Sequence, residues 1–242
     1  MITSRQNGLV KRLRALRDKK QRDLSGEFVV EGVKSVRDAA ESGAEISIVA
    51  ATVKGAALIE NAAFPIEILS DDVFSSVSEE VSPQGVLAIV KKTVPPKEIS
   101  GNAVFLDGVA DPANVGAIIR SAAAFGYDNV LIAGGADAYS NKAVRASMGG
   151  IFRVNVYAGT REEMLALISL PIIIADMHGE TLGKISVPNG HCLCIGNEAH
   201  GVSERLKALA DKTVAIPMGN GMESLNAAVS AGIIMYSLTL KN

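Results

Sequence analysis

Three glycine-rich segments in the second half of the chain carry the polar side chains best suited to chemistry. They span residues 107–120, 195–203 and 216–232, and each begins where a predicted strand ends. Because ligands of parallel α/β sheets bind beyond the carboxyl ends of the strands, we expect the three segments to meet in one site. The polar side chains that could act there belong to Asn114, Arg120, Glu198, Ser224 and Asn226.

The third segment has the composition of a tight loop that opens onto a helix. Pro217 ends the preceding strand, because it has no N–H to give to a sheet ladder. Gly219 and Gly221 then free the backbone for a turn. A helix follows from Glu223, and the free N–H groups at its start suit an anion or the polar edge of a cofactor. The alternative is an ordinary capped helix with Ser224 as its N-cap residue.

The other two segments each hold one conspicuous charge. Arg120 stands in an otherwise apolar helix, where a buried guanidinium would need a partner. A phosphate is one candidate, because its oxygens match the guanidinium fork, and a structural ion pair is the alternative. Glu198 lies between Gly196 and Gly201, where its carboxylate could accept a hydrogen bond from a hydroxyl or an amine. The alternative there is a plain turn followed by a helix cap.

Several common kinds of site are absent from the sequence. There is no Gly-x-Gly-x-x-Gly fingerprint and no P-loop, which argues against dinucleotide binding and nucleotide hydrolysis. There is no nucleophile elbow of the kind that hydrolases carry. The three histidines are scattered along the chain, so we expect no metal site. Asp176 and His178 end one predicted strand without a nucleophile beside them, and we interpret His178 and His200 as loop residues.

Charge is distributed unevenly along the 242 residues. Net charge is −2, yet residues 1–22 hold eight Lys and Arg against one acid. The remaining residues hold 16 basic and 25 acidic side chains. A basic arm on an acidic body points to a polyanion such as RNA, and a solvated helix face is the alternative. The residues we expect to contact RNA are Arg5, Lys11, Arg12, Arg14 and Arg22.

The cysteines and the apolar runs of the sequence indicate the cellular compartment of the protein. Cys192 and Cys194 alternate on a predicted buried strand, and no wider cysteine framework exists. Two thiols of this kind favour a reducing, cytoplasmic setting. The N-terminus lacks the apolar core of a signal peptide. The longest apolar runs, such as residues 172–175, are too short to span a bilayer, so no membrane partner is expected.

Alternating strands and helices predict two α/β domains, at 1–94 and 103–242, joined by a Pro-Pro-containing linker at 95–102. Ser4 is the expected cap of the first helix, and Thr160 with Glu163 has the spacing of a capping box. The expected strands are 27–31, 46–50, 66–69 and 85–90, then 103–107, 129–133, 152–157, 171–176, 192–195 and 213–216. The expected helices are the basic arm, 33–41, 54–61 and one after Ser70, then 114–125, 141–148, one from Thr160, 204–210 and the closing helix.

The three segments, in this order and spacing, resemble the SpoU (TrmH) family of RNA ribose methyltransferases in the SPOUT superfamily. The matching text is Leu-Asp-Gly-Val-Ala-Asp-Pro-Ala-Asn-Val-Gly-Ala-Ile-Ile-Arg-Ser at 106–121, Ile-Gly-Asn-Glu-Ala-His-Gly-Val-Ser at 195–203 and Ile-Pro-Met-Gly-Asn-Gly-Met-Glu-Ser-Leu-Asn-Ala-Ala-Val-Ser at 216–230. The first domain also resembles the substrate-binding domain of that family, through residues 11–22 and 28–32. Met222 and the Ala199-His200 pair depart from the usual pattern, and the pair bears on the substrate side.

This resemblance implies methyl transfer from S-adenosylmethionine to a ribose 2′-hydroxyl of structured RNA. It implies a small N-terminal α/β RNA-binding domain, a C-terminal parallel-sheet α/β domain with a deep trefoil knot, and a homodimer with composite active sites. The reacting centre would comprise Asn114, Arg120, Glu198, Ser224 and Asn226, and the cofactor would contact Gly196, Ile216, Met218, Gly219 and Leu225.

The resemblance also suggests roles for the reacting residues. Arg120 would orient the phosphate and the hydroxyl and stabilise charge, since its guanidinium stays protonated and is a poor base. Ser224 or Asn226 would position the hydroxyl or the loop. Glu198 would hold Asn114 or the neighbouring loops together.

Four readings of the substrate and activity remain open at this point. Ribosomal RNA is the expected substrate, from the two-domain layout and the basic arm, and transfer RNA is the first alternative. A non-catalytic RNA-binding protein on the same scaffold is the second. A nucleotide-binding α/β enzyme acting on a small molecule is the third, and the basic arm counts against it.

Overall fold

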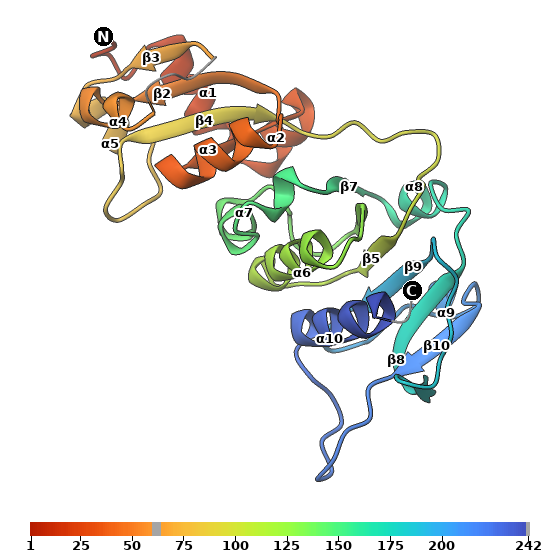
Figure 1. Ribbon diagram of the computed structural model, residues 1–242. Helices are drawn as coiled ribbons and strands as arrows, with labels where there is room; N and C mark the ends of the chain where they lie inside the picture. The colour runs from red at the N-terminus through yellow and green to blue at the C-terminus, as the bar shows by residue number, and fades with distance from the viewer. Residues whose placement is uncertain (60–63, 241–242) are drawn as a thin grey trace. The chain divides into compact units, whose positions relative to one another are not determined.

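The computed structural model describes residues 1–59 and 64–240, which fall into two compact units (Figure 1). The first unit comprises residues 1–92 together with 139–145, and the second comprises 93–138 and 146 onwards. The segment 139–145 lies within the sequence range that we assign to the second domain, yet it packs with the first unit. Tyr139, for example, packs its ring against Phe28 at 4.8 Å between centroids.

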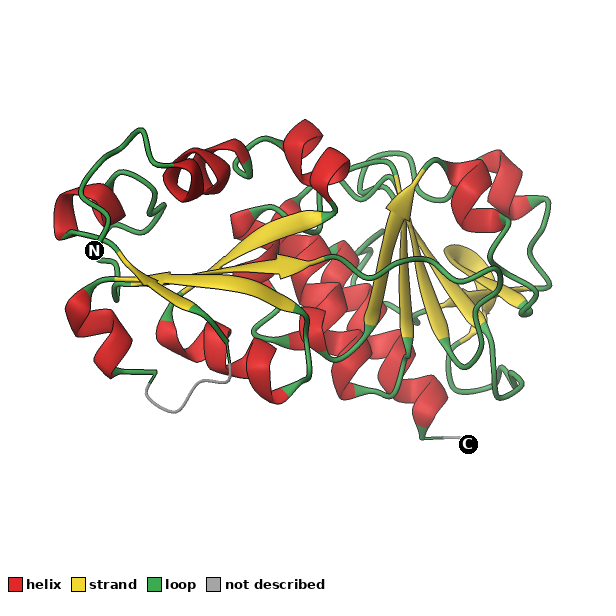
Figure 2. Ribbon diagram, turned by 90° about the horizontal axis from the view of Figure 1, so that it is seen from above, coloured by secondary structure: helices red, strands yellow, loops and turns green. Residues whose placement is uncertain are grey.

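The first unit is built on a four-stranded sheet with helices on both sides (Figure 2). The strand order is β1-β4-β2-β3, with β4 antiparallel to β1 and β2 and with β3 parallel to β2. Alternating strands and helices were predicted here, and the small α/β unit is confirmed. Its strands are β1 (Glu27–Glu31), β2 (Ile46–Ala51), β3 (Ile66–Ile68) and β4 (Val86–Lys91), and its helices are α1 (Gly8–Ala15), α2 (Lys19–Ser25), α3 (Val33–Glu41), α4 (Val53–Ala57), α5 (Asp71–Ser75) and α7 (Asn141–Ala146), whose last residue belongs to the second unit.

The basic arm forms two helices instead of the single one expected. Asn7, not Ser4, caps α1, because its side-chain oxygen accepts a hydrogen bond from the Leu9 N–H at 2.8 Å. Asp18 caps α2 in the same way, so the chain bends between the two helices. Val10 and Leu13 of α1 are buried in the core of this unit. The predicted helix 54–61 is shorter than expected, and residues 60 and 61 lie outside the described part of the chain.

The second unit contains the predicted parallel sheet, which has six strands in the order β10-β8-β9-β5-β6-β7. Helix α6 packs beside α10 (Figure 1). The strands are β5 (Ala103–Asp107), β6 (Asn129–Ala133), β7 (Asn155–Gly159), β8 (Ile172–Thr181), β9 (Cys192–Gly196) and β10 (Lys212–Ala215). The helices are α6 (Pro112–Ala124), the 3₁₀ turn η1 (Gly150–Phe152), α8 (Arg161–Leu165), α9 (Glu204–Lys207) and α10 (Ala227–Thr239).

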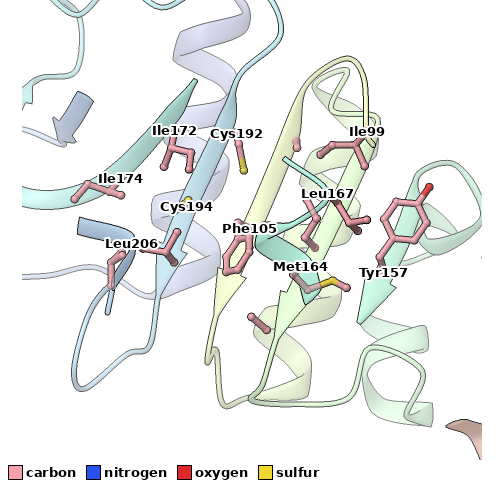
Figure 3. Packing of buried hydrophobic residues seen from close by; sticks show 14 residues of the cluster. Ile99, Phe105, Tyr157, Met164, Leu167, Ile172, Ile174, Cys192, Cys194 and Leu206 are labelled. Atoms are coloured by element: carbon pink, nitrogen blue, oxygen red, sulfur yellow. The ribbon is translucent and has the colours of Figure 1, made fainter. Parts of the chain in front are cut away.

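The core of the second unit explains its continuous apolar strands. Phe105 of β5 and the two cysteines of β9 point to one face of the sheet (Figure 3). They pack there with Met164 of α8 and Leu206 of α9. Alternate strand residues point to the opposite face, where α6 and α10 contact the sheet. Both cysteines are buried free thiols.

The starts of one strand and of the closing helix differ from the prediction. The predicted strand 152–157 begins at Asn155, because the chain first makes the η1 turn after Met148 and Gly149, both with positive φ. The capping box of Thr160 and Glu163 is confirmed. The closing helix begins at Ala227, so the predicted start at Glu223 and the Ser224 cap are both wrong.

Asn226 caps the closing helix instead. Its side-chain oxygen accepts hydrogen bonds from the N–H groups of Ala228 at 2.9 Å and Val229 at 3.2 Å. An amide oxygen placed in this way satisfies two of the donors that a helix start leaves free. Residues 217–226 therefore form an irregular loop between β10 and α10.

Strand β8 carries a bulge that the sequence did not indicate. Its pairing with β10 jumps from Ile174↔Thr213 to Glu180↔Val214. Residues 175–179 are therefore set off from the ladder. Gly179 is required there, because an added Cβ would lie 2.6 Å from the backbone of Thr213 and Val214. None of the described helices is both long and apolar enough to cross a membrane.

Candidate active site

The first two predicted segments meet because their strands are neighbours. In the β5–β9 pair, Asp107 lies opposite Gly196, so the two loops leave the sheet side by side. Gly196 is needed for this geometry, since an added Cβ would lie 2.1 Å from the carbonyl carbon of Gly201. Asn197 fastens the loops together by donating a hydrogen bond to the Gly108 carbonyl oxygen at 2.8 Å.

Glu198 lies where the two loops meet. One of its carboxylate oxygens accepts a hydrogen bond from Asn114 Nδ2 at 2.8 Å, and the other accepts one from the Ala110 N–H at 3.1 Å. Desolvation raises the pKa of Glu198, but the hydrogen bonds from Asn114 and the Ala110 backbone outweigh it, so the pKa is lowered. Glu198 is therefore an ionised acceptor that holds the start of α6.

The third segment joins through Asn226. Its Nδ2 donates to Asn114 Oδ1 at 3.0 Å, while its own Oδ1 caps α10. Asn114 thus donates to Glu198 and accepts from Asn226, which fixes the orientation of its amide. A continuous hydrogen-bonded row runs from Glu198 through Asn114 to Asn226. The sequence-based expectation that the three segments converge matches this geometry.

An ion pair between Asp107 and Arg161, which the sequence did not indicate, joins the end of β5 to the start of α8. Asp107 is 3% exposed, and its Oδ1 accepts hydrogen bonds from Arg161 Nε at 2.8 Å and Nη2 at 2.6 Å. Its Oδ2 accepts one from the Ser203 N–H at 2.8 Å. Arg161 comes from α8, a helix to which the sequence analysis assigned no role. The signal that could have identified the pair is an acidic residue ending a fully apolar strand, which needs a partner when buried.

A pocket of 530 Å³ lies beside this row. Of the predicted cofactor residues, Gly196, Ile216, Met218 and Leu225 line it, and Gly219 is not among the lining residues. Glu198 and Ser224 also line it, whereas Asn114, Arg120 and Asn226 do not. Residues 175–178 of the β8 bulge also form part of the wall, a contribution that the sequence did not indicate.

Arg120 does not occupy the buried position that we expected. Its side chain is exposed, because the stripe of α6 that carries it faces away from the sheet. Within the described residues it has no hydrogen bond or ion pair, so the structural ion pair is not found. Gly150 packs closely against its backbone, since an added Cβ would lie 3.0 Å from the Arg120 Cα. The guanidinium is thus held on a rigid helix but is open to a ligand.

The predicted RNA-binding residues fall into different environments. Arg5 and Lys11 are exposed. Arg12 forms a bidentate pair with Glu27, and Arg14 donates to Ser76 Oγ at 2.7 Å. Arg22 is 6% exposed, and its guanidinium donates at 2.7 Å to the carbonyl oxygens of Leu16 and Arg17. Arg22 is therefore largely buried and ties α2 to the end of α1, and its place in the RNA-binding set stays a prediction.

No group of three His, Cys, Asp or Glu side chains that could hold a metal occurs among the described residues. The site is instead made of amides, one carboxylate, backbone groups and an exposed guanidinium. Such groups can bind and orient a polar ligand and can stabilise charge.

The chain belongs to the SpoU rRNA Methylase family. The model of that family matches residues 101–236, and the model of the MRM3-like substrate binding domain matches residues 7–88. The predicted family, parallel-sheet α/β fold class, RNA methyltransferase activity and S-adenosylmethionine cofactor are thereby confirmed.

Two curated relatives cover nearly the whole chain. The 23S rRNA (guanosine(2553)-2′-O)-methyltransferase RlmP of Bacillus subtilis is 29% identical over 245 residues, which is 98% of each chain. The 23S rRNA (uridine(2479)-2′-O)-methyltransferase of Streptomyces viridochromogenes is 30% identical, over 97% of this chain and 90% of the relative.

Two solved structures superpose on nearly the whole chain. A TrmH-family RNA methyltransferase from Porphyromonas gingivalis superposes with a TM-score of 0.88 at 29% identity, over 100% of both chains. The SpoU methyltransferase AviRb from Streptomyces viridochromogenes, solved in complex with the cofactor AdoMet, superposes with a TM-score of 0.84 at 27% identity, over 98% of both.

Proposed function

We propose that this enzyme methylates a ribose 2′-hydroxyl of ribosomal RNA, with S-adenosylmethionine as the methyl donor. The observation that carries the proposal is the hydrogen-bonded row from Glu198 through Asn114 to Asn226 beside a 530 Å³ pocket. The relatives named above act on 23S rRNA, which supports ribosomal over transfer RNA.

The pocket fits the cofactor in size and in lining. Its volume lies within the range of about 300–1,000 Å³ that suits ligands of this class. Ile216, Met218 and Leu225 offer apolar contact, and Gly196 brings backbone to the wall. When bound, S-adenosylmethionine supplies an electrophilic methyl group. We propose no cofactor contact for Gly219, because it does not line the pocket and an added Cβ there meets no atom within 4 Å.

The protein's own residues orient the ribose and stabilise developing charge. Asn114 and Asn226 hold the α6 and α10 termini in one arrangement, and Ser224 lies exposed at the pocket wall, where its hydroxyl can meet the ribose. The Arg120 guanidinium is a permanent cation that can orient a phosphate and stabilise the negative charge on the ribose 2′-oxygen. That charge develops as the oxygen bonds to the methyl carbon, the carbon–sulfur bond to S-adenosylhomocysteine breaks, and the hydroxyl proton passes to water. In-line transfer depends on such alignment, which contributes much of the rate enhancement.

RNA is held by the basic arm, for which the exposed side chains of Arg5 and Lys11 are the best candidates. The arm belongs to the unit matched by the substrate-binding domain model. Arg12 and Arg14 keep part of their surface open while they contact Glu27 and Ser76.

We retain domain limits of 1–94 and 103–242 as a proposal, with 139–145 as an addition to the first domain. The trefoil knot stays a prediction.

We also propose a homodimer, formed through α10. This helix is apolar around its circumference and leaves four large side chains exposed at helical spacing. A face of this kind on a soluble enzyme marks an interface. A cytoplasmic location is proposed on the two buried free thiols. The exposed apolar residues of this face are Val229, Ile233 and Tyr236 of α10 and Leu240, which follows the last turn of the helix.

The test is transfer of labelled methyl from S-adenosylmethionine to purified unmodified ribosomal RNA and to transfer RNA. The proposal expects label in ribosomal RNA at an alkali-resistant linkage, which marks a 2′-O-methyl group. Label confined to transfer RNA would overturn the choice of substrate. Absence of label in both, with cofactor binding intact, would favour the non-catalytic RNA-binding reading.

A further inference from the structure

The first unit contains a second cavity, separate from the cofactor pocket. Its volume is 250 Å³. This is just below the range of about 300–1,000 Å³ for drug-sized ligands, so it suits one ring system. Leu13, Leu16 and Val77 give it an apolar lining, and Tyr139 adds an aromatic side chain.

One buried carboxylate faces this cavity. Glu31 is 9% exposed and lies at the end of β1. Its two oxygens accept one hydrogen bond each, from the Ser78 hydroxyl and from the Glu79 N–H at 3.0 Å. A carboxylate offers about four acceptor positions, so each oxygen keeps capacity for one more donor. The residue thus presents two adjacent acceptors to whatever enters.

The rim of the cavity is polar and includes a cation. Arg17 donates to the Ser78 carbonyl oxygen at 3.0 Å, and its Nε lies 3.4 Å from Glu79 Oε1. The other Glu79 oxygen accepts from Asn141 Nδ2 at 2.8 Å. The Arg17 side chain is 41% exposed, so the guanidinium can still meet a phosphate at the mouth.

We propose that this cavity binds one unstacked guanine base of the RNA substrate. The inference rests on the proposed function, and it adds a base-recognition site in the substrate-binding unit. Proteins that read RNA sequence take single unstacked bases into such sites and bind their Watson–Crick edges. Guanine carries two adjacent N–H donors on that edge, which match the two acceptors of Glu31. The other bases do not present two adjacent donors there.

The location of the cavity supports an RNA occupant. It lies between the two helices of the basic arm and β1, within the range matched by the substrate-binding domain model, and residues 139–142 complete it. The charged rim and apolar interior correspond to a nucleotide, with its phosphate outside and its base inside.

The test is the equilibrium binding of labelled decaribonucleotides to the full-length protein. One is all uridine, and three others carry a single central G, A or C. We expect the G-containing oligomer to bind about tenfold more tightly than the others. Equal affinity for all four oligomers would overturn the proposal.

Two variants test the residues. Glu31→Gln replaces one acceptor by a donor, so the preference for G should disappear. Val29→Phe, at a half-buried position of the lining, should fill the cavity and abolish the preference while all-uridine binding stays within about twofold.

The matched control is Glu67→Gln, an exposed carboxylate on β3, which should keep the full preference. Thermal melting checks the fold, and if Glu31→Gln is unfolded, Val29→Phe decides. A well-folded Val29→Phe protein that keeps the preference would contradict the proposal.

Methyl transfer to ribosomal RNA, measured on the same preparations, separates this inference from the proposed function. An enzyme that methylates ribosomal RNA but shows no preference for G contradicts the cavity assignment alone. A protein that prefers G but methylates no RNA contradicts the proposed function alone.

Discussion

Asn114 Nδ2 donates a hydrogen bond to Glu198 Oε1 at 2.8 Å, although the two residues are 84 positions apart. This contact joins the start of α6 to the loop after β9, and Asn226 extends it to the start of α10. Because Glu198 also lines the cofactor pocket, the contact links cofactor binding to the residues that we assign to the ribose.

Glu198→Gln should lower the rate of methyl transfer while the fold is kept. The glutamine amide can accept only through one oxygen, so either Asn114 or the Ala110 N–H loses its partner. Loss of a hydrogen bond to a charged group predicts a fall of about tenfold to hundredfold in single-turnover rate. Glu204→Gln, an exposed carboxylate on α9, serves as the control. A Glu198→Gln enzyme as fast as the wild type would show that the row is only structural.

Arg120→Ala should lose turnover but keep its affinity for S-adenosylmethionine. The side chain is exposed and is not among the residues lining the cofactor pocket. Removal of one group that stabilises developing charge costs about 10²–10³ in rate. Arg120→Lys keeps the positive charge but loses the planar guanidinium fork, so its rate should lie between those of the wild type and of Arg120→Ala. Rate is measured by methyl transfer, and affinity by calorimetric titration. Equal loss of rate and of cofactor affinity would assign Arg120 to the structure of the site.

Asp107→Asn should destabilise the second unit by about 2–3 kcal/mol, because the buried carboxylate pairs with Arg161 and the Ser203 N–H. Urea unfolding measures the change. The same variant should weaken cofactor binding, since the loop before Ser203 lines the pocket. Asp72→Asn, an exposed residue of α5, should change stability by no more than about 0.5 kcal/mol. Unchanged stability in Asp107→Asn would refute the supporting role of the ion pair.

The exposed and buried cations of the basic arm should affect different properties, namely RNA binding and stability. The two variants are the double substitution Arg5→Ala with Lys11→Ala and the single substitution Arg22→Ala. The first pair removes two exposed cations, so the slope of log affinity for RNA against log salt should fall by about 1.4–1.8. Arg22→Ala should leave the slope unchanged but lower the melting temperature, since its guanidinium holds the Leu16 and Arg17 carbonyl oxygens. The opposite pattern would mean that Arg22, and not the exposed arm, contacts RNA.

The sequence was sufficient to predict the parallel sheet and the meeting of the three segments. Both follow from local signals, namely apolar strands that end in glycine and polar residues. The Asp107–Arg161 pair could not be predicted, because a partner 54 positions away leaves no local pattern. The β8 bulge was missed for a similar reason, since its register depends on contact between Gly179 and β10.

The side-chain environments were the hardest part to predict. Arg22 and Arg5 belong to the same basic arm, yet one is buried and the other is exposed. The difference arises from the break between α1 and α2, where the Arg22 guanidinium donates hydrogen bonds to the Leu16 and Arg17 carbonyl oxygens. Arg120 shows the reverse, because an arginine among apolar residues was expected to be buried but lies on the exposed stripe of α6.

The most direct test of the central claim is to map 2′-O-methyl groups in ribosomal RNA from a strain that lacks this protein. The proposed function predicts that one methylated ribose disappears, that the wild-type gene restores it, and that the Arg120→Ala gene does not. Ribosomal RNA whose 2′-O-methyl pattern is unchanged in the deletion strain would contradict the claim.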